Sequence, residues 1–134
     1  MPILAIHRDA ADDLQSIKAR GEYADYGVIL AFLQQAKSDP SLLQTLAEDW
    51  FGEDESINYS VQRVVSLHQR GKRIWRVKVL TLKGLAAGHR VLYAFDRNQQ
   101  TFYVLGIPPR DIAYDHTHPR IQRLIAVYDR LDLA

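Results

Sequence analysis

Cysteine is absent from the 134 residues of this chain. Without a thiol, the protein has no disulfide, no thiolate nucleophile and no cysteine-based zinc site. No apolar run approaches the roughly 20 residues that a membrane-spanning helix needs. Residues 1–7 lack a basic segment followed by a long apolar stretch, so no signal peptide is expected. These absences predict a cytoplasmic protein with no membrane association.

The chain also lacks a glycine-rich phosphate loop and a Gly-x-Ser-x-Gly elbow, which removes support for a serine hydrolase. It has no low-complexity segment and no internal repeat. A hydrophobic content of 47% in 134 residues is enough for one substantial core. We therefore expect one domain over residues 1–134.

Charge is distributed unevenly along a chain whose net charge is only +1. Residues 39–62 hold six acids and no lysine or arginine, whereas residues 63–97 hold nine basic residues and one acid, Asp96. Such asymmetry is typical of proteins that bind a polyanion such as nucleic acid. The alternative is a solvated sheet edge protected by Lys and Arg, which is common.

Hydrophobic periodicity predicts an α+β fold. A short strand over residues 3–7 precedes a helix capped by Asp9, a second helix over residues 25–37 and a third helix after Asp39-Pro40. The third helix is expected to carry Trp50 and Phe51 on its apolar face. Residues 59–67 fit neither a helix nor a strand clearly.

The second half of the chain changes to strands. Residues 74–80, 89–96 and 101–107 alternate, and short connections predict an antiparallel meander. Thr117 or His118 caps a final helix that opens at Pro119. Its apolar stripe is formed by Ile121, Leu124, Ile125, Tyr128 and Leu131.

The strand over residues 74–80 is the most informative segment for function. Because residues two apart share a face of a strand, Arg76 and Lys78 point to the same side. Arg90 joins them if the neighbouring strand has the appropriate register. Arg76 and Lys78 can alternatively be ordinary surface charges.

Several groups with possible roles in catalysis follow the last predicted strand. They are Arg110, Tyr114, Asp115, His116 and His118. Cleavage of RNA at a ribose needs a base for the 2′-hydroxyl, cations for the phosphorane and an acid for the leaving oxygen. Arg and Lys meet the second need. Histidine, with an ordinary pKa near ~6.5, suits proton transfer, so His116 is a candidate. Tyr114 is another, if neighbouring cations favour its phenolate.

The same residues have other interpretations. Tyr114 can equally be packed, and His118 beside Pro119 is better explained as part of a helix cap. His116 and His118 with Asp111 or Asp115 can be read as metal ligands, but a third, distant ligand is missing. We therefore expect no metal.

Four segments together resemble the RelE/ParE superfamily of bacterial toxins, and most closely its RelE/HigB-like ribosome-dependent mRNA interferases. The segments are Trp75–Val79, His89–Tyr93, Tyr103–Arg110 and Tyr114 before a C-terminal helix. The resemblance covers roughly residues 73–131. It implies a small, mainly antiparallel sheet with N-terminal helices and a C-terminal helix packed on it. It also implies a cognate antitoxin as partner, mRNA on the ribosome as substrate, and no metal or cofactor.

The family's functional residues transfer by position. Arg76 and Lys78 match the two basic positions of one strand, Arg90 the arginine of the next, and Arg110 the arginine after the final core strand. Tyr114 or His116 falls where the family has its acid–base residue. The spacing from Arg110 to Tyr114 is shorter than the corresponding spacing in the family, and the spacing to His116 fits better. Both residues therefore remain candidates for the acid–base residue.

Lys72, Arg73 and Lys83 are expected to bind RNA. A longer helical and acidic segment at about residues 39–62 departs from the compact family members.

Three functions follow as expectations. The first is a toxin that cleaves mRNA on the ribosome and inhibits translation. The second is a noncatalytic ParE-type inhibitor of DNA gyrase, against which Arg76, Lys78 and Arg90 argue. The third is a nontoxic RNA-binding module that uses the same basic face.

Overall fold

The computed structural model describes residues 2–46, 50–51, 59–80 and 87–133. It has an α+β fold with a mixed sheet of six strands in the order β1-β6-β5-β4-β3-β2. The strands are β1 (Ile3–Ile6), β2 (Trp50–Phe51), β3 (Tyr59–Arg63), β4 (Trp75–Val79), β5 (Val91–Asp96) and β6 (Thr101–Gly106). The helices are α1 (Arg8–Ala19), α2 (Tyr23–Ser38), α3 (Pro40–Thr45), α4 (Val65–His68) and α5 (Pro119–Leu131).

The predicted meander is confirmed as β4, β5 and β6, which pair in antiparallel fashion. The sheet is larger than predicted, because β3 and β2 extend it beyond β4 and β1 pairs in parallel with β6. The ambiguous residues 59–67 form β3 and the start of α4, which explains why no single period fitted them. β5 begins at Val91, two residues later than predicted.

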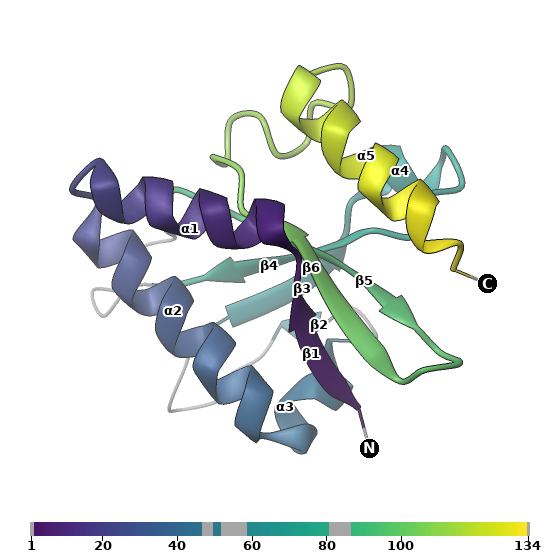
Figure 1. Ribbon diagram of the computed structural model, residues 1–134, viewed down its shortest axis with the longest axis horizontal. Coiled ribbons are helices and arrows are strands. Elements are labelled where there is room, and N and C mark those ends of the chain that lie inside the picture. The colour runs from purple at the N-terminus through teal and green to yellow at the C-terminus, as the bar shows by residue number, and fades with distance from the viewer. Residues whose placement is uncertain (1, 47–49, 52–58, 81–86, 134) are drawn as a thin grey trace.

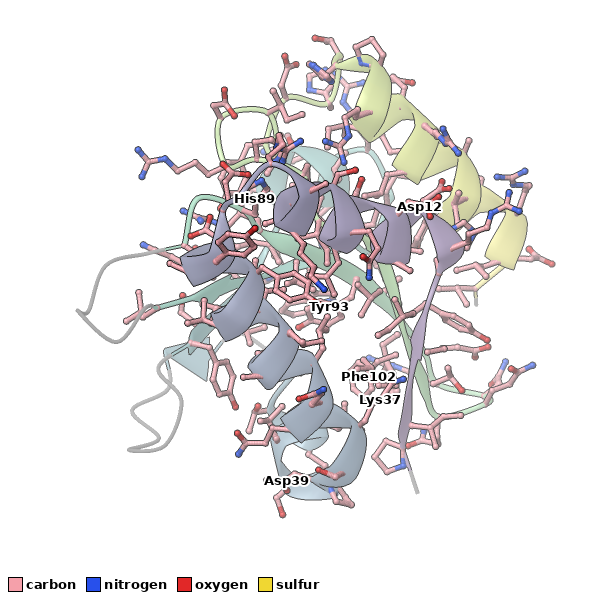
Figure 2. The ribbon with its side chains drawn as sticks, turned by 60° about the vertical axis from the view of Figure 1, so that its left-hand side comes forward. Asp12, Lys37, Asp39, His89, Tyr93 and Phe102 are labelled. Carbon is pink, nitrogen blue, oxygen red and sulfur yellow. The ribbon has the colours of Figure 1, made fainter. Side chains whose placement is uncertain are left out.

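The sheet separates two apolar clusters (Figure 1). On one face, α1, α2 and α3 cover β-strand residues that include Val77, Tyr93 and Phe102 (Figure 2). On the other face, α5 and α4 cover Leu92, Ala94 and their neighbours. Burial of both sheet faces by helices is the source of most of the stability. No helix among the described residues is long and apolar enough to cross a membrane.

Two predictions about helix ends are wrong. The N-cap of α1 is His7, whose Nδ1 accepts a hydrogen bond of 3.1 Å from the backbone N–H of Asp9. Trp50 and Phe51 belong to β2 and pair with Val61 and Ser60, so they do not continue α3. α3 ends at Thr45. By contrast, Asp39 caps α3 and His118 caps α5, as expected.

Candidate anion-binding and catalytic site

The two central arginines, Arg76 and Arg90, lie on the same face of the sheet. Arg76 on β4 is the register partner of Leu92 on β5, and Arg90 precedes Leu92 by two residues. Lys78 lies on this face too, opposite Ser60 of β3. Arg76 and Arg90 are only 7% and 6% exposed, whereas Lys78 is half-buried. The predicted grouping of cations is therefore present, but two of its members are interior side chains.

Among the described residues, both buried guanidinium groups donate hydrogen bonds only to uncharged acceptors. Arg76 donates from Nη1 to the carbonyl and hydroxyl oxygens of Ser60, at 3.2 and 3.0 Å, and from Nη2 to Oε1 of Gln62. Arg90 donates from Nη1 to the carbonyl oxygens of Ala87 and His89, at 2.7 and 3.3 Å. These bonds fix the two side chains in position but leave their positive charges uncompensated.

Tyr114 lies directly against these arginines. Its hydroxyl accepts a hydrogen bond of 3.3 Å from Nε of Arg90, and its side chain is 45% exposed. The pKa of Arg76 is lowered from its usual value by burial and by the positive charge of Arg90, while the hydroxyls of Tyr114 and Tyr93 oppose this lowering. Arg76, Arg90 and Tyr114 thus interact with one another, and we call them the arginine–tyrosine cluster.

Buried charges in proteins are normally paired with an opposite charge, because desolvation is costly. In the described part of the chain, no Asp or Glu forms an ion pair with Arg76 or Arg90. The cluster therefore presents net positive charge next to a partly exposed phenol. Such a site favours an external anion, and bidentate guanidinium groups match the geometry of a phosphate.

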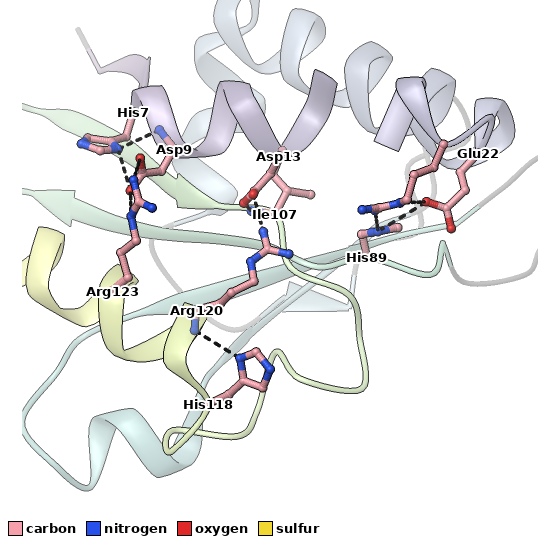
Figure 3. Close-up of polar contacts among 10 residues, drawn as sticks. His7, Asp9, Asp13, Glu22, His89, Ile107, His118, Arg120 and Arg123 are labelled. Carbon is pink, nitrogen blue, oxygen red and sulfur yellow. Dashed lines mark hydrogen bonds and ion pairs between the residues drawn. The ribbon is translucent and has the colours of Figure 1, made fainter. Parts of the chain in front are cut away.

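A buried network holds the backbone that leads into Arg90. Oδ2 of Asp25 on α2 accepts hydrogen bonds from the backbone N–H of Gly88 at 2.7 Å and from Nδ1 of His89 at 3.0 Å. A Cβ at Gly88 would lie 2.9 Å from that oxygen, so a larger residue at this position would require the Asp25 side chain to shift. His89 is 4% exposed and lies 3.9 Å from a carboxylate oxygen of Glu22 (Figure 3). Sequence patterns do not distinguish Asp25 from other acids near a helix start, so this positioning role was not predicted.

Arg110 lies close to the same end of β5. Its backbone N–H donates to the carbonyl of Gly88 at 2.8 Å, and His89 forms an isolated bridge with Pro109. The segment after β6 is thereby joined to the segment before β5. The side chain of Arg110 is exposed. This position beside Arg90 is compatible with the predicted role in binding an anion.

His116, the other predicted proton carrier, has a different environment. Its Nε2 lies 2.6 Å from Nη2 of Arg70, and its carbonyl accepts from Nε2 of Gln122. Among the described residues, neither Arg76 nor Arg90 forms a hydrogen bond with it. The structure thus places Tyr114, and not His116, in contact with the buried cations.

His118 and Asp115, two of the possible metal ligands, form hydrogen bonds with residues close to them in sequence. Nδ1 of His118 accepts from the backbone N–H of Arg120 at 3.1 Å. Thr117 donates to Oδ1 of Asp115 from both its hydroxyl and its backbone N–H, and these bonds lower the pKa of the Asp115 carboxyl. Within the described ranges, no group of three or more His, Asp or Glu side chains is arranged to hold a metal ion.

Two of the predicted RNA-binding residues, Lys72 and Arg73, contact α5. Nζ of Lys72 forms an ion pair of 2.6 Å with Asp129 on α5. Arg73 has an exposed side chain, and its backbone N–H donates to the hydroxyl of Tyr128 at 3.1 Å. Lys83 and the acidic residues 48, 49 and 53–55 lie outside the described residues.

Two further arginines, on α5, are neutralised by α1. Arg123 forms hydrogen bonds of 2.9 and 3.0 Å with the Asp9 carboxylate, and Arg120 pairs with Asp13 (Figure 3). Asp13 also accepts from the backbone N–H of Ile107 at 2.8 Å. Through Asp9 and Asp13, α1 is thus bonded both to α5 and to the residue that follows β6.

No protein-family model, curated protein or solved structure matches this chain. The similarity to RelE/ParE toxins therefore stays a prediction, and the geometry of the site is the remaining guide to function.

Proposed function

We propose that the protein is the toxin of a bacterial type II toxin–antitoxin system and has a RelE-like fold. In this proposal it is a metal-independent endoribonuclease of the RelE/HigB-like type. It would cleave mRNA on the ribosome, inhibit translation in the cytoplasm and be neutralised by a cognate antitoxin. The observation that carries the proposal is the presence of two buried guanidinium groups with only neutral acceptors beside an exposed tyrosine.

The cluster can supply the electrostatic part of phosphodiester cleavage. Arg76 and Arg90 would bind the scissile phosphate and stabilise the charge that develops on the phosphorane. Their existing hydrogen bonds to Ser60, Gln62 and backbone carbonyls hold them in place before substrate binds, so little reorganisation is needed. Lys78 and the exposed Arg110 would extend the positive field along the RNA backbone.

Tyr114 is the proposed proton carrier. Its hydroxyl accepts a hydrogen bond from Nε of Arg90, so it lies beside the cations that are proposed to bind the phosphate. As the base, the deprotonated Tyr114 oxygen would take the proton of the 2′-hydroxyl. The 2′-oxygen would then bond to phosphorus while the bond from phosphorus to the 5′-oxygen breaks, which gives a 2′,3′-cyclic phosphate. The leaving 5′-oxygen would take a proton from water. His116 lies two residues further along the same segment and is the alternative proton carrier.

Inducible expression in a bacterium, followed by primer extension on a reporter mRNA, tests this proposal. We expect growth arrest and cuts within translated codons, and co-expression of an antitoxin encoded beside the gene should restore growth. Growth arrest with intact mRNA and an induced DNA-damage response would instead indicate the ParE-type activity. RNA binding without growth arrest would indicate the nontoxic module.

A further inference from the structure

A second basic surface lies at the start of β4 and the end of β5, beside the arginine–tyrosine cluster. It is a groove of about 340 Å³ between the start of β4, the end of β5 and the C-terminal part of α5. We call it the basic–aromatic groove. Its lining includes Arg73, Arg97, Trp75, Phe95 and Tyr128.

Arg73 before β4 and Arg97 after β5 bring positive charge to the groove. No Asp or Glu among the described residues lines the groove. The nearest sequence neighbour of opposite charge, Asp96, accepts from the backbone N–H groups of Asn98 and Gln99. Arg73 and Arg97 have exposed side chains. Their charges are therefore available to an anionic ligand.

The aromatic rings of the groove are held in fixed positions and remain partly exposed. Phe95 stacks on Phe102 with a centroid separation of 4.3 Å. Trp75 packs edge-on against His68 at 5.5 Å, and the guanidinium of Arg63 lies 6.0 Å from the Trp75 ring centre. The hydroxyl of Tyr128 accepts from the backbone of Arg73. Rigid aromatic faces beside arginines are the combination with which proteins stack unpaired bases and bind the phosphates between them.

We infer that the basic–aromatic groove binds single-stranded RNA that flanks the segment bound at the arginine–tyrosine cluster. The choice of RNA over another anion rests on the proposed function. Arg90 directly precedes β5 and Phe95 lies near its end, and at about 3.3 Å per residue they are separated by about 17 Å. On β4, Trp75 of the groove directly precedes Arg76 of the cluster. The groove would thus bind the nucleotides that lie next to the segment held at the cluster.

Binding of a fluorescein-labelled, 2′-O-methylated single-stranded oligoribonucleotide tests the inference, because this probe cannot be cleaved through its 2′ position. Anisotropy titrations over a range of salt concentrations give the affinity and its salt dependence. For Arg73→Gln and Arg97→Gln, the slope of log K against log salt should become shallower by about 0.7 per arginine. Arg8→Gln, which removes an exposed charge at the start of α1, is the matched control and should leave the slope unchanged.

Substitutions of Trp75 test whether a base of the RNA stacks on its ring. Trp75→Leu should weaken binding by about 5- to 150-fold, because stacking on one ring contributes about 1–3 kcal/mol per base. Trp75→Phe keeps a ring and should lose much less. If the Leu variant does not fold, as judged by circular dichroism, the two arginine variants decide the question.

The outcomes separate this inference from the proposed function. Unchanged RNA binding by the Arg73 and Arg97 variants overturns the inference, even if Tyr114→Phe abolishes cleavage. Reduced binding by these variants in a protein that never cleaves mRNA supports the inference and contradicts the proposed activity. A wild-type protein that binds polyglutamate but not the oligoribonucleotide also overturns the inference, since the groove would then accept an acidic peptide.

Discussion

Arg76 on β4 and Arg90 directly before β5 differ from Arg120 and Arg123 on α5 in the groups that accept their hydrogen bonds. All four guanidinium groups are held by several hydrogen bonds or by an ion pair. The side chains of Arg120 and Arg123 are 39% and 69% exposed, yet carboxylates of α1 neutralise their charges. Arg76 and Arg90 are almost fully buried, and their acceptors are neutral. Exposure alone thus does not show which arginine is available to a phosphate.

Whether an arginine can attract a phosphate depends on the charge of the group that accepts its hydrogen bonds. A carboxylate partner cancels the charge that an RNA phosphate would meet, whereas a carbonyl, hydroxyl or amide oxygen leaves most of it. The two buried arginines are therefore the ones expected to bind the reacting phosphate. The two on α5 are expected to contribute to stability only. Each prediction below tests one side of this comparison, from the largest expected effect to the smallest.

Tyr114→Phe removes the hydroxyl that contacts Arg90 and should have the largest effect. Loss of a positioned proton carrier typically reduces the rate by about 10²- to 10⁴-fold. Single-turnover cleavage of mRNA on purified ribosomes measures this loss. His116→Ala is the matched control, because His116 bonds to Arg70, and its rate should fall by less than about tenfold. If His116→Ala has the larger effect, the roles of the two residues are reversed.

Arg76→Gln keeps a hydrogen-bonding side chain but removes the buried charge. We expect a reduction in cleavage rate of about 10²- to 10³-fold, as for the loss of one donor to the transition state. The thermal unfolding midpoint should change little or rise, because an unpaired buried charge is removed. Arg120→Gln, a substitution of the same type on α5, should leave the rate within about twofold of the wild-type value. Equal losses in both variants would contradict the comparison.

Asp13→Ala should have a clear effect on stability but not on cleavage by the folded protein. The substitution breaks the ion pair with Arg120 and leaves the backbone N–H of the buried Ile107 without its acceptor. An unsatisfied buried donor costs about 1–3 kcal/mol of unfolding free energy. Urea denaturation measures the difference. Asp13→Asn retains an acceptor oxygen and should recover most of the loss, whereas equal destabilisation in both variants would show that the ion pair is the larger contribution.

Arg123→Ala should have the smallest effect. The side chain is 69% exposed, and an exposed ion pair typically contributes only about 0–1 kcal/mol. The change in unfolding free energy should shrink as salt is added. A loss well above this range, or a loss of RNA cleavage, would place Arg123 in a functional role that its pairing with Asp9 does not suggest.

Much of the fold follows from local sequence patterns. The apolar stripe of α5 and the cap at His118 with Pro119 depend on residues close in sequence, so both were predictable. The strand formed by Trp50 and Phe51 could not be predicted in this way. A strand of two residues has no measurable period, and it is defined by its pairing with Ser60 and Val61. Alternation within β4 likewise placed Arg76 and Lys78 on one face.

The remaining features of the site depend on contacts between distant segments. Burial of Arg76 and Arg90 results from packing around the sheet, and their neutral acceptors are supplied partly by β3. Asp25 reaches Gly88 and His89 across more than sixty residues of sequence. Sequence patterns make both Tyr114 and His116 candidates for the acid–base residue, and only the structure shows that Tyr114 contacts Arg90 whereas His116 contacts Arg70.

The most direct test of the central claim is to observe the arginine side chains while RNA binds. In a protein labelled with ¹⁵N, the Nε–H signals of Arg76, Arg90, Arg120 and Arg123 can be assigned by single Arg→Lys substitutions. On addition of the 2′-O-methylated oligoribonucleotide, the signals of Arg76 and Arg90 should shift, and those of Arg120 and Arg123 should remain in place. Shifts confined to the α5 arginines, with no change at Arg76 and Arg90, would contradict the account.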